Sequence, residues 1–131
     1  MAEIELILAR QLASYLALPI LIIDAEGSTF FYNEPAERLL GLPFDEVGPM
    51  TLAERGAAMA IRDESGEPVP LDRLPPARAL RQAQPDSRRL TMRGFDGVER
   101  QVEVTAFPLT RTGGVVVGSV AVVWEHGEPG T

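Results

Sequence analysis

Few residues in this chain could carry chemistry. It contains no cysteine, and its one histidine, His126, lies close to the end of the sequence. The lack of cysteine excludes disulfides, cysteine nucleophiles and thiolate metal sites, and one histidine cannot build a polyhistidine metal centre. Asp24, at the end of an apolar run, is the one carboxylate that would suit acid–base catalysis, although a turn-forming role is the simpler interpretation. The sequence therefore predicts no metal site and no catalytic residue, and we expect the protein not to be an enzyme.

Charged residues are spread unevenly along the chain. The 131 residues carry a formal net charge of −7, and all 12 basic residues are arginine. Between positions 73 and 100, seven arginines are accompanied by only three carboxylates, those of Asp86, Asp96 and Glu99. A solvated strand or helix face is the favoured interpretation of this cluster, and a docking surface for an acidic partner is the alternative. The acidic balance of the whole chain, and the single aromatic residue in the cluster, argue against nucleic acid as a partner.

The sequence shows no targeting or membrane-spanning segment. Its longest strongly apolar run, residues 16–23, has eight residues and is interrupted by Pro19, whereas a spanning helix needs about 20. Glu3 and Glu5 stand where a signal peptide would carry positive charge. We therefore expect a cytoplasmic protein with no membrane partner.

An amphipathic helix is predicted at the N-terminus, in the segment 1–17. Ile4, Leu8, Leu12 and Tyr15 recur at helical spacing, and Pro19 follows where the helix must end. This apolar stripe suits two interpretations, packing on the chain's own domain or pairing with a second copy. The second makes these four residues candidates for a homodimer interface.

The rest of the chain alternates strand and turn signals around a central helical part. Residues 19–24 and 29–32 predict a hairpin around Gly27, and Asn33 is placed to cap a helix that Gly41 ends. Residues 42–76 contain many prolines and glycines and favour short helices or loops, and a further helix is predicted over 75–84. Three long strands follow, predicted over 87–95, 98–107 and 115–124, with Asp96-Gly97 as a hairpin turn.

These elements predict an α+β fold in one domain. Strands joined by tight hairpins give an antiparallel sheet of five, with short helices folded over one face and the amphipathic helix beside it. We expect the domain to span residues 18–126 and residues 127–131 to form a flexible tail.

At this point the chain resembles a PAS domain of the bacterial signalling type. The resemblance covers residues 18–125 and rests on the order and spacing of three parts. The first is the run from Pro19 to Gly41, which is similar to the family's opening hairpin, capping Asn and first core helix. The second combines residues 62–71 and 74–80, and the third combines Phe95-Asp-Gly, Ala106-Phe-Pro-Leu, Gly114 and Gly118.

The resemblance implies a half-open sheet whose helices close a pocket that senses a small molecule, or a module that pairs protein subunits. It also implies limits on the ligand. Flavin photoreceptors of the family bond flavin to a cysteine, and coumaroyl members also need one, which this chain lacks. Haem-binding members need an axial ligand, usually histidine, on the long helix beside the pocket, and His126 lies outside it. The resemblance therefore disfavours haem and leaves the cofactor unknown, with a non-covalent flavin, an organic acid and an apolar metabolite as the open alternatives.

The resemblance also selects the residues that would line such a pocket. By analogy with the family, Leu21 and Ile23 point inward from the first strand, while Ile20 and Ile22 pack beneath the N-terminal helix. An ordinary closed core is the alternative reading of the same residues. Tyr32 and Arg62 are the polar candidates among the predicted ligand-binding residues, which are Leu21, Ile23, Phe30, Tyr32, Leu40, Arg62, Leu80, Leu90, Met92, Val104 and Trp124.

The leading functional hypothesis is a sensing module in signal transduction. It binds a small molecule without a covalent bond, forms a homodimer, or does both, and passes a signal to a protein partner by population shift. The first alternative is a pure interaction or scaffold domain with a filled core. The second is a small α+β acid–base enzyme, for which Asp24 is the only residue to test.

Overall fold

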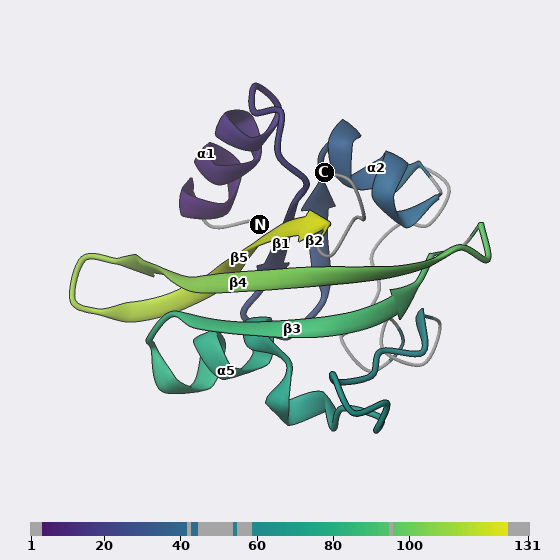
Figure 1. Ribbon diagram of the computed structural model, residues 1–131. Helices are drawn as coiled ribbons and strands as arrows, with labels where there is room; N and C mark the ends of the chain where they lie inside the picture. The colour runs from purple at the N-terminus through teal and green to yellow at the C-terminus, as the bar shows by residue number, and fades with distance from the viewer. Residues whose placement is uncertain (1–3, 42, 45–53, 55–58, 95, 126–131) are drawn as a thin grey trace.

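A five-stranded antiparallel sheet forms the centre of the computed structural model, which describes residues 4–41, 43, 44, 54, 59–94 and 96–125 (Figure 1). The strands lie in the order β2-β1-β5-β4-β3, so that the last strand of the chain is the central one. Their bounds are β1 Ile20–Asp24, β2 Thr29–Tyr32, β3 Asp86–Arg93, β4 Glu99–Arg111 and β5 Val115–Glu125. The predicted α+β class and the antiparallel sheet of five are confirmed.

Helices lie on both sides of this sheet (Figure 1). Helix α1 lies on one side and helix α5 on the other. The helices of the described residues are α1 Ile4–Ala13, α2 Glu34–Leu40, α5 Pro75–Gln82 and a short 3-10 turn, η1 Leu71–Arg73. Within residues 42–76, where short helices or loops are predicted, positions 42, 45–53 and 55–58 lie outside the described residues, as does the predicted tail 127–131.

Alternation along the strands gives the sheet two apolar faces. One face, which we call the cavity face, carries one large buried cluster that includes Leu21, Leu90, Val102, Ala121 and Val123. The other, which we call the α1 face, carries a second cluster under helix α1. The central strand β5 is therefore buried on both sides, as its continuous apolar sequence predicts.

Helix α1 packs on the α1 face through its small and buried side chains. Leu6 and Ala13 contact the cluster that contains Ile20, Ile22 and Val120. The prediction that Ile20 and Ile22 pack beneath the N-terminal helix is confirmed. The helix is shorter than predicted because it ends at Ala13, after which Tyr15 and Leu16 donate turn hydrogen bonds to the carbonyls of Leu12 and Ala13.

Asn33 joins the two sides of the molecule. Its side-chain oxygen accepts hydrogen bonds from the amides of Ile20 (3.0 Å) and Ala36 (3.2 Å), the second of which caps helix α2. Its side-chain nitrogen donates to the carbonyls of Ala13 (2.9 Å) and Leu18 (2.8 Å). The residue is buried, with 2% exposure, and all four bonds replace water that it cannot reach. The predicted helix cap is confirmed, and the same side chain also fixes the end of α1.

Helix α2 ends against the turn between β3 and β4. Gly41 adopts a left-handed conformation (φ 81°), and a Cβ atom there would lie 2.8 Å from the backbone nitrogen of Asp96. Glycine is thus required both for the backbone angle and for the close contact. The contact brings α2 over the end of the cavity face.

In the described part of the chain, no helix has the length and apolar character needed to cross a bilayer.

Candidate functional site

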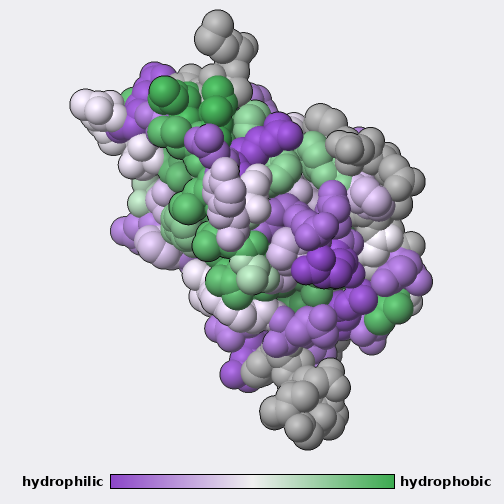
Figure 2. Space-filling model, turned by 90° about the horizontal axis from the view of Figure 1, so that it is seen from above, coloured by the Kyte–Doolittle hydropathy of each residue, from purple (hydrophilic) through white to green (hydrophobic). Residues whose placement is uncertain are grey.

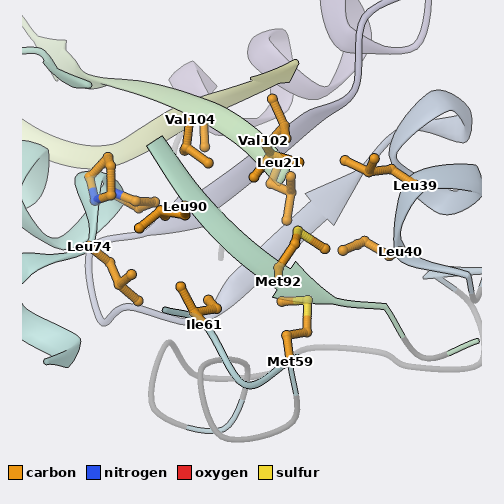
Figure 3. Close-up of a pocket in the computed structure, with 14 residues that line it drawn as sticks. Leu21, Leu39, Leu40, Met59, Ile61, Leu74, Leu90, Met92, Val102 and Val104 are labelled. Atoms are coloured by element: carbon orange, nitrogen blue, oxygen red, sulfur yellow. The ribbon is translucent and has the colours of Figure 1, made fainter. Parts of the chain in front are cut away.

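A cavity of about 60 Å³ lies between the cavity face of the sheet and the segments that cover it. Figure 3 shows side chains from the strands and from α2 directed toward a common space. Each of its fourteen described lining residues is aliphatic, methionine or proline, and together they are Leu21, Leu39, Leu40, Met59, Ile61, Leu74, Pro75, Pro76, Leu90, Met92, Val102, Val104, Ala121 and Val123. The arrangement is an apolar hollow built by four strands, two helices and the segment 59–61.

Side-chain size explains why this part of the core is hollow. Ala121 lies at the centre of the sheet, paired with Leu21 of β1 on one side and Ala106 of β4 on the other. Ala121 offers only a methyl group at this level, and its neighbour Ala106 adds no bulk beside it, so the surrounding leucines and valines leave space above Ala121. A residual void of this volume costs about 1–2 kcal/mol relative to a filled core.

Five of the predicted ligand-binding residues are brought together around the cavity. They come from four separate elements and are Leu21, Leu40, Leu90, Met92 and Val104. Their role in ligand binding stays a prediction, since the same residues belong to the largest buried cluster of the protein.

Three further predicted residues lie on the same side of the sheet but away from the cavity lining. Ile23 packs against Ala77 and Leu80 in a small cluster of its own beneath α5. Tyr32 is buried in the large cluster, where its ring meets Phe44 edge-on with 5.2 Å between centroids. The structure therefore uses Ile23, Leu80 and Tyr32 as packing residues.

Phe30 and Trp124 lie on the opposite side of the sheet from the cavity, so the prediction that they point inward is wrong. A β-bulge between Ile22 and Ile23 leaves Phe30 as an extra residue in β2, and it packs with the cluster under α1. Trp124 follows the cavity-lining Val123, so strand alternation turns it to the α1 face, where it is 43% exposed.

Arg62 has a structural role at the edge of the sheet and does not line the cavity. Its backbone exchanges two hydrogen bonds with Thr91 of β3, with N–O distances of 2.9 and 2.8 Å. Its guanidinium forms an ion pair with Glu99. The prediction that Arg62 supplies a polar group to the pocket is therefore wrong.

Several lining residues were not predicted. Val102 shares the strand parity of the predicted Val104, and that parity is a signal that could have identified it. Ala121 and Val123 lie in β5, which is apolar on both sides, so its sequence does not show which residues face the cavity. Met59, Ile61 and Leu74 come from the proline-rich part of the chain, and no periodic pattern marks them.

The acidic groups with shifted pKa lie in turns outside the cavity. Hydrogen bonds from Ser65 and Glu67 lower the pKa of Asp63, and the amide of Val98 and the side chain of Arg100 lower that of Asp96. Asp24 accepts hydrogen bonds from the amides of Glu26 (3.0 Å) and Ser28 (2.9 Å), which is the geometry of a turn. Among the described residues, no group of three or more His, Cys, Asp and Glu side chains could hold a metal ion.

The arginine cluster at positions 73–100 is largely paired with carboxylates. Arg78 lies 3.1 Å from Asp86, and Arg100 lies 3.3 Å from Asp96. Arg81, Arg88 and Arg89 pair at longer distances with acidic residues from the segment 63–72. This internal pairing supports a solvated, charge-balanced face over a docking surface for an acidic partner.

The predicted homodimer residues all point away from the body of the protein. Ile4, Leu8, Leu12 and Tyr15 are 63%, 55%, 62% and 82% exposed, although each is large and apolar. Figure 2, which views the molecule from the α1 side, shows hydrophobic residues gathered in a band flanked by hydrophilic ones. Helix α1 therefore packs on its own domain through Leu6 and Ala13, and the four residues of the predicted stripe take no part in that packing.

The cavity does not fit flavin or haem. A flavin ring needs hydrogen-bonding partners and its phosphate needs a charged or amide-rich anchor, while haem needs an axial ligand. The described lining offers none of these groups. His126, the one histidine, lies outside the described residues.

The fold agrees with solved structures although the sequence has diverged widely. No family model and no curated protein matches the sequence. The PAS domain of BvgS from Bordetella pertussis superposes with a TM-score of 0.70 at 19% identity, over 97% of this chain and 90% of that one.

Two other solved structures give the same result. The PAS domain of nitrogen regulation protein NR(II) from Vibrio parahaemolyticus has a TM-score of 0.63 at 18% identity, over 91% of this chain and 98% of that one. The LOV protein of Rhodobacter sphaeroides has a TM-score of 0.73 at 12% identity, over 98% of this chain and 71% of that one. This chain has the PAS fold.

Proposed function

We propose that this protein is a signal-sensing module that holds a small molecule non-covalently in the apolar cavity beneath its sheet. One observation carries the proposal, the cavity of about 60 Å³ with its wholly apolar described lining. An unfilled hollow lowers stability, and a bound molecule would recover part of that free energy. The PAS fold supports the proposal as an analogy, since the solved structures that share it include a PAS domain from a two-component sensor histidine kinase.

Sensing would work by a shift between populated arrangements of the cavity wall. Met59 and Ile61 line the cavity, and the next residue, Arg62, is bonded to the edge strand β3. A molecule that moves Met59 or Ile61 would thereby change the contacts of Arg62 with Thr91 and Glu99. Only a ligand that binds one arrangement better than the other produces such a shift.

Native mass spectrometry of the gently purified full chain tests this function. A reproducible mass above that of the polypeptide, lost on mild heating or denaturation, is the expected result. A clean polypeptide mass, together with no change in melting temperature across a small-molecule panel, would instead favour a scaffold domain with no ligand.

We further propose that the module forms a homodimer through the exposed side of α1. The specific observation is that Ile4, Leu8, Leu12 and Tyr15 form an exposed apolar stripe while the same helix is anchored by Leu6 and Ala13. Contiguous apolar surface of this kind usually marks an interaction site. A second copy presents the same stripe, so a two-fold arrangement buries both at once.

Sedimentation velocity of two charged variants tests the dimer. Leu8→Glu/Leu12→Glu places two carboxylates in the stripe, and we expect it to sediment as a monomer where the unaltered chain is a dimer. Ser14→Glu/Ala17→Glu adds the same charge at exposed positions beyond the helix and should leave the dimer intact. If the unaltered chain is a monomer at about 50–100 μM, the proposed homodimer is contradicted.

A further inference from the structure

We infer that the cavity selects uncharged, apolar molecules, from small hydrocarbons up to a single aromatic ring, and excludes carboxylates and phosphates. This inference rests on the proposed sensing function and names the class of ligand. Three observations support it. They are the apolar chemistry of the described wall, the pairing of neighbouring arginines with carboxylates, and the volume of the cavity.

The described part of the wall has no side chain that could replace the hydration of a polar ligand. Its fourteen side chains include no hydroxyl, amide, carboxyl or guanidinium group. Among them, only the thioether sulfurs of Met59 and Met92 can accept a hydrogen bond, and they do so weakly. A carboxylate that entered would lose its water shell without compensation, whereas a hydrocarbon would gain from leaving water.

Three arginines close in sequence or in the sheet to lining residues are paired with carboxylates, and the first is Arg100, which lies opposite Met92 and pairs with Asp96 and Glu125. Arg62 follows the lining residue Ile61 and forms an ion pair with Glu99. Arg88, two residues before the lining residue Leu90, lies 3.9 Å from Asp63. None of these arginines belongs to the described lining, so the pairing supports the apolar selectivity.

The size of the cavity limits the ligand, and the methionines determine how far it can grow. At about 60 Å³ it is smaller than the apolar cavity of about 150 Å³ known to hold benzene in another protein. Met59 and Met92 are unbranched and flexible, so they can repack to enlarge the space, and thioethers make favourable contacts with aromatic edges. Xenon or a short alkane should therefore enter directly, and one aromatic ring should enter after the methionines move.

Methyl NMR of the full chain with labelled methionine methyl groups tests the ligand class. The probes are xenon, toluene and benzoate, because toluene and benzoate share a ring and differ in charge. We expect xenon and toluene to shift the Met59 and Met92 resonances in a saturable way, with toluene binding at least tenfold tighter than benzoate at neutral pH. Ala121→Val and Val123→Ile narrow the space and should each weaken toluene binding at least fivefold, while Ala25→Val, in an exposed turn, should leave it unchanged.

The outcomes separate this inference from the function on which it rests. Benzoate binding as tight as toluene binding, and equally sensitive to Ala121→Val, would overturn the apolar selectivity and leave sensing in place. No saturable shift with either xenon or toluene would also overturn it, and a co-purified molecule in the native mass spectrum would then preserve the sensing function. If both experiments show no ligand, the function itself fails.

Discussion

The two faces of the sheet are made of the same kinds of residue, yet they are completed differently. On the cavity face, α2, α5 and the segment 59–61 cover the strands and leave a hollow of about 60 Å³. On the α1 face, Leu6 and Ala13 fill the space over Ile20, Ile22 and Val120, and the far side of α1 stays apolar and exposed. One face suits a small molecule inside the protein, and the other suits a partner outside it.

The difference arises from where the chain places its smallest residues. On the cavity face, Ala121 and Ala106 lie side by side and the covering segments do not reach down to fill the space above Ala121. On the α1 face, Gly118 lets Leu6 descend until a Cβ atom at position 118 would lie 2.7 Å from its Cδ2 atom. A small residue thus leaves a hollow where the cover does not reach it and makes a close contact where the cover approaches.

The largest effect should come from removing the residue that joins the two faces. Asn33→Ala removes the side-chain partner of the amides of Ile20 and Ala36 and of the carbonyls of Ala13 and Leu18, and among the described residues only the carbonyl of Ala13 keeps a second bond, from the amide of Leu16. Because the bonds to Ile20, Ala36 and Ala13 are buried, we expect the free energy of unfolding in urea to fall by about 3–5 kcal/mol.

A matched variant separates the capping of α2 by Asn33 from its hydrogen bonds to the carbonyls of Ala13 and Leu18. Asn33→Ser can still cap α2 but cannot reach both carbonyls, so it should recover only about 1 kcal/mol of the loss. If Asn33→Ala costs no more than a helix cap, about 1 kcal/mol, then the two faces are not held together by this side chain.

Crowding the α1 face should have the next largest effect. Gly118→Ala places a methyl group 2.5 Å from the carbonyl oxygen of Ile23 as well as against Leu6. We expect a loss of about 2–3 kcal/mol, measured by urea unfolding. Adding Leu6→Ala should not rescue the variant, since the carbonyl oxygen belongs to the backbone and cannot move aside. A full rescue would show that the close packing of Leu6 alone explains why position 118 requires glycine.

Adding two carbon atoms on the cavity face should act in the opposite direction. Ala121→Val fills part of the hollow, and we expect thermal and urea unfolding to show a gain of about 0.5–1 kcal/mol. Ala106→Val makes the same change at the neighbouring position, which is buried but does not line the cavity, and should cost about 1–2 kcal/mol. Losses of equal size at both positions would mean that the hollow is not accessible to added volume.

Local signals allowed much of this fold to be predicted, and the misses have physical reasons. Asn33 and Gly41 act within one turn of their own positions, so their roles in capping α2 can be read from the sequence. The inward placement of Phe30 is wrong because a β-bulge, which no local pattern marks, shifts the parity of β2. Trp124 was misplaced because β5 is apolar on both sides and shows no alternation.

The cavity itself was only partly predictable. Strand parity and family resemblance together identified Leu21, Leu90, Met92 and Val104. The volume of a cavity depends on how far covering segments descend, which is a long-range property. Met59 and Ile61 therefore became visible as lining residues only in three dimensions.

The smallest expected effect is a response to acid, and it should come from the rim of the cavity face and not from its lining. Asp63 lies two residues beyond Ile61, and its carboxylate accepts hydrogen bonds from the amides of Ser65 (2.9 Å) and Glu67 (3.0 Å). The hydroxyl of Ser65 (2.7 Å), these amides and the guanidinium of Arg88 together lower the pKa of Asp63. A lowered pKa in the folded state means that folding favours the carboxylate. The contribution of Asp63 to stability is therefore complete above the usual pKa of about 4 and is lost as the pH falls through the lowered pKa.

Melting temperatures of the unaltered chain and Asp63→Asn, measured from pH 6 to pH 2.5, should converge as the pH falls, because the variant lacks the titrating group. Parallel curves would show that ionised Asp63 adds nothing to the stability of the protein. The response to acid would then come from other carboxylates such as Asp96, whose pKa is also lowered.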